Sequence, residues 1–295
     1  MSDYILTCES TADYPRSFFE RRNIPFACFH YELDGVAGVD DLYTSTTPEK
    51  FFSDLKAGGR STTSQPNAGE YVDLWEPYLE EGRDVLHVTL SSGISGAYNS
   101  ACIASGQLSA KYPERTVRVI DSLQASAGYG LLVDYMADRR DAGMGLTELA
   151  AWAEGHKLEL NAWFFVGDIE CLKRGGRVSK TSALIATALK ICPVLNIDYK
   201  GALIPRQKIR TTKKAIAELV KMFLAHAKGG ASYDGKCVIS QSMCRDDAQA
   251  VADGIVAAAP QLAGKIEIND IGTVIGSHTG PGTVALFFMG DKRVD

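Results

Sequence analysis

The sequence predicts an α/β fold with a mostly parallel sheet in the first half of the chain and a mixed sheet in the second. Apolar runs of strand length alternate with amphipathic segments of helical length through the first half, which is typical of a parallel sheet covered by helices. In the second half, two apolar runs are separated only by Tyr-Lys-Gly, which indicates a hairpin and antiparallel pairing. We therefore expect two α/β domains, residues 1–158 and 159–295.

Short local signals predict the elements of the first half. The runs YILTC, DVLHVTL and TVRVI predict strands, because each is apolar and of strand length. Helices are expected over residues 16–22, 48–56 and 98–108, and in a segment that ends near Asp141. Pro66 is expected to be the first helical residue of the segment AGEYVDLWEPYLEEG, since proline suits that position.

The predicted strands and helices of the second half follow a different order. A strand is expected at AWFFVG, and DIECLKRGGRVSKTSALIATALKI is interpreted as two short helices separated by a Gly-Gly loop. The runs CPVLNID and ALIPRQKIR form the predicted hairpin. The remaining elements are helices over 211–227 and 246–258, and strands at KCVISQ, KIEINDI and TVALFFMG.

Composition indicates a globular protein whose partner is a small molecule or another protein. Of 295 residues, 45% are hydrophobic and 23% charged, enough for a sizeable core. The net charge of −5, without a block of like charges, argues against nucleic acid or an anionic membrane surface as the main partner. The start MSDYILTCES lacks a basic segment, and no apolar run approaches the roughly 18 residues of a membrane span. We expect a cytoplasmic protein.

The sequence offers little support for a metal or a nucleotide cofactor. Its seven cysteines are scattered singly, which favours reduced and mostly buried side chains over zinc ligands or disulfides. No carboxylate cluster has the spacing of metal ligands. No phosphate-binding glycine fingerprint is present, and GYGLL follows no strand directly. We therefore expect neither cofactor nor metal.

Three hydroxyl-rich segments are expected at the carboxyl ends of strands, where ligands bind in open α/β sheets. They are Glu9–Thr11, Ser61–Pro66 and Ser91–Gly96. Glycine beside the serines of the third segment would let backbone approach a ligand, and the following helix would favour an anion. The alternative is that these hydroxyls only cap the helices that follow them.

Cationic and imidazole groups come from the second half. Lys173, Arg174, Arg177 and Lys180 surround a Gly-Gly pair in a loop predicted between helices. His278 lies in SHTGPGT, which we expect to form a loop held by a Gly-Pro-Gly turn. A surface histidine without a role is the alternative.

A serine hydrolase is a second interpretation of the same residues. Gly93-Ile94-Ser95-Gly96-Ala97 nearly matches the Gly-x-Ser-x-Gly elbow, with alanine at its last position. Ser95 would be the nucleophile and His278 the base, with Asp270 as the acid between them in chain order. Against this, the second half lacks the expected succession of parallel βα units.

Taken together, the motifs resemble the DegV family of bacterial fatty-acid-binding proteins, the lipid carriers of the fatty acid kinase system. The resemblance covers most of the chain through an ordered set of motifs: ESTADYP, TTSQP, LSSGISGAY, VIDS, LKRGGRVSK, LKICPVL, KIRTTKKA and HTGPGT. One position departs from the family, since Glu9 stands where an aspartate usually precedes Ser-Thr.

The resemblance implies a carrier that performs no chemistry and buries a long-chain fatty acid, such as palmitate, stearate or oleate, between its two domains. By motif position, Thr63 and Ser95 would hold the carboxylate, with Thr62 and Gly96 beside them, and Arg177 and His278 close by.

The family also implies a partner and a pathway. Arg210 would meet a separate kinase that forms an acyl phosphate for phospholipid metabolism, and the resemblance allows transient contact with a membrane. A regulatory module without lipid is a further alternative. Such a module would carry no extractable fatty acid.

Overall fold

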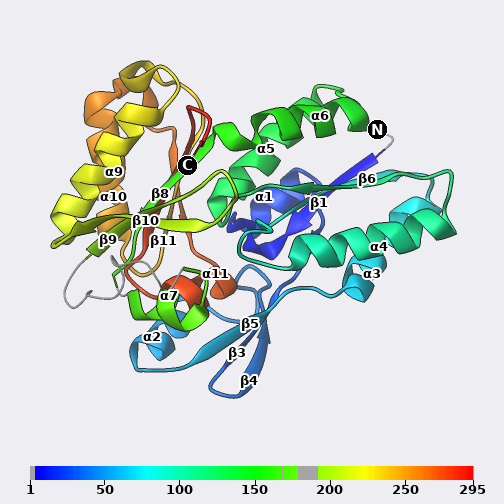
Figure 1. Ribbon diagram of the computed structural model, residues 1–295, viewed down its shortest axis with the longest axis horizontal. Helices are drawn as coiled ribbons and strands as arrows, with labels where there is room; N and C mark the ends of the chain where they lie inside the picture. The colour runs from blue at the N-terminus through cyan, green and yellow to red at the C-terminus, as the bar shows by residue number, and fades with distance from the viewer. Residues whose placement is uncertain (1–3, 168, 179–191, 295) are drawn as a thin grey trace.

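Parallel strands form the larger sheet of the first half. The protein is represented by a computed structural model that describes residues 4–167, 169–178 and 192–294 (Figure 1). The sheet has the order β2-β1-β6-β7, and all neighbouring strands run parallel. Its strands are β1 (Tyr4–Glu9), β2 (Phe26–Ala27), β6 (Asp84–Thr89) and β7 (Val117–Asp121). The predicted parallel sheet is confirmed.

Helices lie between these strands along the chain and after the last of them. They are α1 (Arg16–Arg21), α2 (Pro48–Lys56), α3 (Ala68–Glu80), α4 (Ala97–Lys111), α5 (Ala127–Asp141) and α6 (Leu146–His156). The expectation that Pro66 opens α3 is wrong. Asn67 caps that helix through a capping box with Glu70, so the first helical residue is Ala68.

A small antiparallel sheet was not expected from the sequence. Its order is β4-β3-β5, with β3 (His30–Leu33), β4 (Val36–Val39) and β5 (Ser61–Ser64). It projects from the body of the molecule together with α2 (Figure 1). The expectation that residues 61–66 follow a parallel strand as a loop is therefore wrong in part, because residues 61–64 pair with β3 instead. All four residues carry hydroxyl groups, so the segment lacks the alternation of apolar and polar residues by which a strand is predicted.

A six-stranded mixed sheet occupies the second half, as predicted. Its order is β10-β9-β8-β13-β11-β12. The strands are β8 (Leu160–Phe165), β9 (Cys192–Ile197), β10 (Leu203–Ile209), β11 (Cys237–Gln241), β12 (Ile266–Asp270) and β13 (Val284–Met289). Strands β9 and β10 form the predicted hairpin, and β11 with β12 is the parallel pair.

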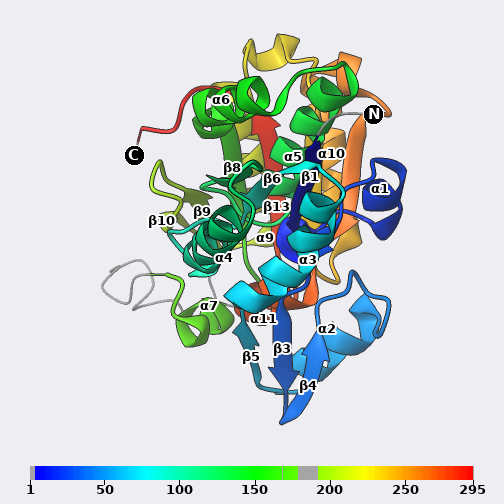
Figure 2. The same cartoon turned by 90° about the vertical axis from the view of Figure 1, so that its right-hand side faces the viewer.

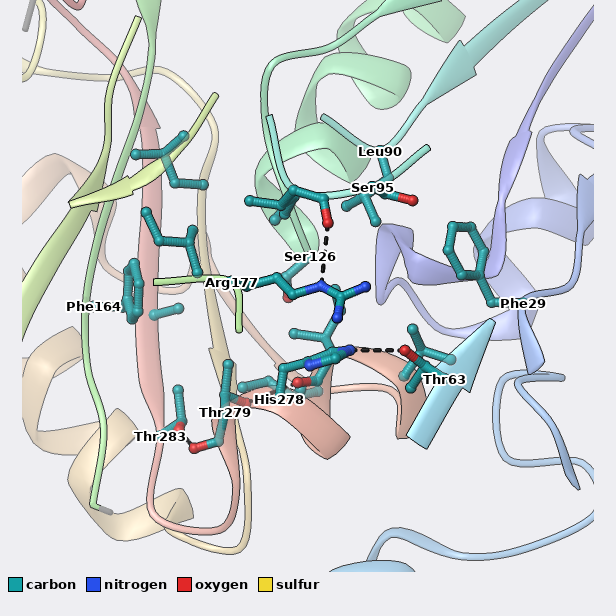
Figure 3. Close-up of a pocket in the computed structure, with 18 of the residues that line it drawn as sticks. Phe29, Thr63, Leu90, Ser95, Ser126, Phe164, Arg177, His278, Thr279 and Thr283 are labelled. Carbon is teal, nitrogen blue, oxygen red and sulfur yellow. Dashed lines mark hydrogen bonds between the residues drawn. The ribbon is translucent and has the colours of Figure 1, made fainter. Parts of the chain in front are cut away.

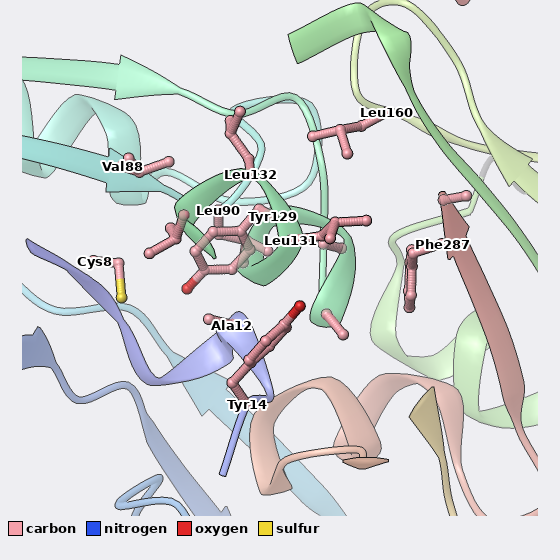
Figure 4. Close-up of a cluster of buried hydrophobic side chains, with 14 of the residues drawn as sticks. Cys8, Ala12, Tyr14, Val88, Leu90, Tyr129, Leu131, Leu132, Leu160 and Phe287 are labelled. Carbon is pink, nitrogen blue, oxygen red and sulfur yellow. The ribbon is translucent and has the colours of Figure 1, made fainter. Parts of the chain in front are cut away.

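Both faces of this sheet are buried. Along β13, Leu286 and Phe288 pack toward helices α9 (Thr212–His226) and α10 (Arg245–Ala258). Ala285 and Phe287 point to the opposite face, because side chains alternate along a strand. There they join a core that includes Tyr129 of α5 and residues of β1 and β6 (Figure 4). One hydrophobic core therefore spans both halves of the chain.

Two further helices are short. They are α7 (Ile169–Gly175) and α11 (Thr273–Thr279). His278 thus lies on a helix, and the expectation of a loop at SHT is wrong, because the Gly-Pro-Gly turn starts only after Thr279. The second short helix expected after Gly176, and Lys180 with it, lie outside the described residues. Single 3-10 turns occur at η1 (Ser10–Ala12), η2 (Lys157–Glu159), η3 (Gly230–Ser232) and η4 (Pro260–Leu262).

The division of the chain at residue 158 remains a proposal. The six-stranded sheet begins with β8, two residues after that position, which agrees with it. Helix α5 of the first half nevertheless packs on β8, β11 and β13 of the second, as Figures 1 and 2 show. Among the described residues, no helix combines the length and apolar character that crossing a membrane requires.

Candidate functional site

An apolar cavity lies between the two halves of the chain. Its volume is about 720 Å³ including the part open to solvent. The first half lines it with Phe29, Thr63, Leu90, Ile94, Ser95, Ala125 and Ser126. The second half lines it with Phe164, Arg177, Ile197, Leu203, Ile271, Val274, Ile275, His278, Thr279, Thr283, Ala285 and Phe287 (Figure 3).

Three polar side chains of the wall already donate their hydroxyl protons within the protein. The Thr279 hydroxyl donates to the Ile275 carbonyl at 3.1 Å, and the Thr283 hydroxyl donates to the Thr279 carbonyl at the same distance. The Ser126 hydroxyl donates to Asp13 at 2.5 Å. These residues can line the wall without leaving a buried donor unpaired. This part of the wall suits a hydrocarbon chain.

Thr63 and His278 meet at one side of the cavity although they are 215 residues apart. The Thr63 Oγ1 lies 2.8 Å from His278 Nε2, from β5 and α11 respectively (Figure 3). Burial, reinforced by the positive charge of Arg177, lowers the pKa of His278 to about 4. The imidazole is therefore neutral near pH 7. Its Nδ1 has no hydrogen-bond partner among the described residues.

Ser95 and Arg177 lie beside this pair (Figure 3). The Ser95 hydroxyl donates to Gln65 Oε1 at 3.3 Å and accepts from the Ala97 N–H at 3.2 Å. The Arg177 Nε donates to the Ile94 carbonyl at 3.3 Å, which links the segment after α7 to the loop Ser91–Gly96, called the serine-rich loop below. Hydroxyls and one cation thus gather at the same end of the cavity.

The serine-rich loop is fastened to the turn between β9 and β10. Ser91 Oγ donates to the Gly201 carbonyl at 2.9 Å and accepts from the Gly93 N–H at 3.0 Å. A Cβ on Gly201 would lie 1.9 Å from Ser91 Oγ, and one on Gly93 would lie 2.6 Å from the Lys200 carbonyl. Only glycine fits at these two contacts, so the loop that carries Ser95 depends on the hairpin turn.

Not every expected site residue lies at the cavity. Four of them line it together: Thr63, Ser95, Arg177 and His278. Thr62 is exposed on the opposite side of β5, since neighbouring residues of a strand face opposite ways. Gly96 is the N-cap of α4, where a Cβ would lie 2.8 Å from Gln65. Arg210 is exposed and follows β10 directly.

The first hydroxyl-rich segment has a structural position instead. Glu9 is fully buried and accepts hydrogen bonds from the Leu90 N–H at 2.8 Å and the Tyr71 hydroxyl at 2.5 Å. The Thr11 hydroxyl lies 3.1 Å from that of Tyr129. Glu9 thereby joins the end of β1 to the start of the serine-rich loop, and neither it nor Thr11 lines the cavity.

The residues of the hydrolase interpretation do not form a triad. Ser95 donates to Gln65, and His278 Nε2 is next to Thr63. Asp270 accepts from Gln241 at 2.5 Å. Among these three described residues, Ser95, His278 and Asp270, no hydrogen bond joins one to another, whereas a triad requires a nucleophile-to-base and a base-to-acid contact.

Sequence patterns did not reveal the apolar wall. Phe29 comes from the segment between β2 and β3, whereas Phe164 lies on β8 and Phe287 on β13. Among the residues that line the cavity, Ser126 alone has a left-handed backbone, at φ 54°. The alternation along TVALFFMG indicates which side chains share a face, but not what lies opposite. Within the described ranges, no three histidine, cysteine or acidic side chains come together as a metal site would require.

Comparisons with known proteins agree with this architecture. The family model described as "Uncharacterised protein, DegV family" matches residues 5–291. A DegV domain-containing protein of Clostridium perfringens is 34% identical over 293 residues, which is 99% of each chain.

Two solved structures are similar over nearly the whole chain. A DegV family protein from Thermus thermophilus, described with fatty acid binding, is 28% identical with a TM-score of 0.87, covering 98% of this chain and 99% of that chain. A fatty acid binding DegV family protein from Streptococcus agalactiae is 25% identical with a TM-score of 0.84, covering 99% and 100%. From the extent of these matches, this chain belongs to the DegV family.

Proposed function

We propose that this protein binds a long-chain fatty acid, with its hydrocarbon chain in the apolar cavity and its carboxylate at the end formed by Thr63, Ser95, Arg177 and His278. The observation that carries the proposal is the cavity itself, an apolar space with hydroxyls and a cation at one end. Relatives described as fatty acid binding support the same ligand class. Palmitate, stearate and oleate are suitable candidates.

The hydrocarbon chain supplies the affinity. Each methylene group moved from water into an apolar wall contributes about 0.8 kcal/mol. A tail of roughly 16 carbons therefore offers more free energy than the ordering of ligand and protein consumes. Phe164, Phe287 and Val274 provide such a wall from β8, β13 and α11.

The carboxylate needs donors, because a buried anion without hydrogen bonds is costly. In the proposed complex, Nε2 of His278 carries the imidazole proton and donates it to Thr63 Oγ1. The Thr63 hydroxyl proton is then free to bond the carboxylate, since a hydroxyl can accept and donate at once. The Ser95 hydroxyl would turn from Gln65 to the ligand. Since His278 is neutral, Arg177 supplies the positive charge.

Removing both hydroxyls tests the proposal. In a Thr63→Ala/Ser95→Ala double variant, the carboxylate loses two donors at a mouth that water can reach. We expect a loss of about 1–3 kcal/mol, or roughly tenfold to a hundredfold in affinity. Mass spectrometry of an organic extract from natively purified protein would show a stoichiometric fatty acid in the wild type and a depleted one in the variant. Absence of lipid from both proteins would overturn the proposal.

We further propose that the carrier presents its ligand to a separate kinase that phosphorylates the carboxylate, and that Arg210 contacts this partner. The family resemblance supports this step. Arg210 is exposed at the end of β10, before α9. Its guanidinium can pair with carboxylates of another protein.

Arg210→Ala should lower kinase-dependent acyl phosphate formation about tenfold while leaving fatty-acid content unchanged, because a rim charge affects association more than ligand binding. The assay measures phosphate transfer from labelled ATP to oleate bound by the carrier, in the presence of a purified fatty acid kinase. Lys228→Ala is the control, since it removes a distant surface cation. Equal rates for wild type and Arg210→Ala would refute the docking role.

A further inference from the structure

Two buried carboxyl groups face the start of α11, the helix that carries His278. Asp13 is 3% exposed and follows η1, and Asp40 is 1% exposed and follows β4. A methyl group on Gly272 would lie 2.5 Å from Asp13 Oδ1 and 3.3 and 3.4 Å from the two Asp40 oxygens. The two carboxyl groups therefore converge on the residue that precedes α11.

The pair lacks a balancing cation in the part of the chain that the structure describes. There, neither Asp13 nor Asp40 forms an ion pair with a lysine, arginine or histidine. Asp13 Oδ1 and both Asp40 oxygens also make no hydrogen bond of ordinary geometry to a described residue. The donors that lower their pKa values are the Gly272 N–H for Asp13, and the Thr273 hydroxyl, the Val274 N–H and the Ser10 hydroxyl for Asp40. Two adjacent carboxylates in such a place cannot both ionise at moderate cost. A proton held between them removes most of that cost, as in other carboxyl pairs.

The titration behaviour expected of the two groups agrees with the geometry. Burial raises the pKa of Asp13 well above its ordinary value, and the neighbouring Asp40 raises it further. Burial raises the pKa of Asp40 to about 6, although Thr273, the Val274 N–H and Ser10 oppose the shift. The other titratable or charged groups around the pair are Arg16, Cys28, Tyr31, Asp41, Tyr43, Tyr129 and Asp270.

Both carboxyl groups are connected to the cavity wall. Asp13 accepts the Ser126 hydroxyl at 2.5 Å, and Ser126 lines the cavity. The backbone N–H of Asp40 donates to the carbonyl of Phe29 at 2.8 Å, and Phe29 lines the cavity as well. The N-cap of α11 is Gly272, which has no side chain to cap the helix. The negative charge of the pair therefore lies at the N-terminus of α11, where no side chain of the N-cap residue caps the helix.

We propose that Asp13 and Asp40 are positioning residues for the ligand: they share one proton, their single negative charge anchors the start of α11, and loss of the proton loosens the helix that holds His278 against Thr63. This inference rests on the proposed fatty-acid site. It predicts that ligand affinity falls as pH rises above neutral, although His278 is already neutral there and the ligand carboxylate is already ionised.

The sign of the effect on stability follows from the raised pKa values. A group that binds its proton more tightly in the folded state contributes stability at low pH and loses it as pH rises through the folded-state pKa. The pair therefore makes the wild type less stable as pH rises from the ordinary aspartate pKa of about 4. The loss due to Asp40 is complete near pH 6, so a further loss above that pH comes from Asp13, whose pKa is raised well above its ordinary value. An asparagine at either position supplies an amide donor in place of the shared proton and should remove this loss.

Asparagine variants separate a shared proton from two independent carboxylates. The probe is cis-parinaric acid, a fluorescent fatty acid, titrated into delipidated protein between about pH 6.5 and about pH 9. For the wild type we expect a Kd that rises about threefold or more across this range. Asp13→Asn and Asp40→Asn should each bind within about threefold of wild type at neutral pH and lose the pH dependence. The double variant, which has no charge on the pair, should bind about tenfold more weakly.

Several outcomes would overturn the inference. Single variants that each weaken binding about tenfold at every pH, with additive effects in the double variant, would show two independent structural carboxylates. A melting temperature that rises with Ca²⁺ and falls with EDTA would show that a cation, not a proton, joins the pair. Asp73→Asn on α3 is the control, since Asp73 is exposed.

The melting temperature of delipidated protein at the same pH values keeps the test independent of the ligand. It should fall with rising pH in the wild type but not in either single variant. If the wild type binds no cis-parinaric acid, the proposed function fails. The pH dependence of the melting temperature still tests whether Asp13 and Asp40 share a proton. A flat melting curve in the wild type would overturn the inference even if binding is tight.

Discussion

Ala285→Phe is expected to abolish fatty-acid binding while the protein remains folded. Ala285 lies on β13 opposite Phe164 of β8 and contributes its methyl group to the cavity wall. A phenyl ring there would occupy space equivalent to about six methylene groups of the ligand. The lost burial amounts to roughly 5 kcal/mol, or between three and four orders of magnitude in Kd. In the protein without ligand, the added ring would fill part of the cavity and pack against its apolar side chains.

The measurement is the fatty-acid content of purified Ala285→Phe, together with its affinity for cis-parinaric acid. Ala285→Ser is the matched control, because it changes the same position without filling the cavity. The melting temperature of delipidated Ala285→Phe should be equal to or above that of delipidated wild type. Undiminished lipid in the phenylalanine variant would place the ligand elsewhere in the molecule.

Gly201→Ala is expected to lower the free energy of unfolding by about 3 kcal/mol, with a fall of about 5 °C in melting temperature. Gly201 has a φ of +75°, which costs a residue with a side chain about 1–2 kcal/mol. Its added Cβ would also lie 1.9 Å from Ser91 Oγ. Since Ser91 holds the serine-rich loop, the displacement should reach Ser95 and weaken ligand binding too.

Gly264→Ala separates the two causes. Gly264 has a similar φ of +71°, but no described residue beyond its chain neighbours comes within 4 Å of the position that an added Cβ would take. We expect this variant to lose only the backbone contribution of about 1–2 kcal/mol and to bind fatty acid normally. Thermal unfolding of both variants, followed by calorimetry, gives the comparison. Equal melting temperatures would show that the contact between the hairpin turn and the serine-rich loop contributes little.

Local patterns were sufficient for most of the secondary structure. The alternation of apolar runs and amphipathic segments predicted the parallel sheet, and the short Tyr-Lys-Gly interruption predicted the hairpin of β9 and β10. They were insufficient for β5, because Ser61–Ser64 is a strand of hydroxyl residues without apolar alternation. They also misplaced His278, since SHT looks like a turn beside Gly-Pro-Gly but is the last part of α11.

The candidate site was predictable only through its motifs. The resemblance pointed to Thr63, Ser95, Arg177 and His278, and these residues do line one cavity. Thr62 was expected beside them but lies on the other side of β5. Side chains along a strand point alternately to its two faces. A motif with two neighbouring threonines therefore does not show which of them faces inward unless the strand itself is predicted.

The sequence by itself determined the fold class, the hairpin and the hydroxyl and cationic motifs, because each depends on residues close together in the chain. Only the tertiary structure decided that Thr63 meets His278, that β8, β13 and α11 enclose an apolar cavity, and that Asp13 faces Asp40. These contacts join segments far apart in the chain. Their existence depends on how whole sheets and helices pack, which the local preferences of the residues involved do not specify.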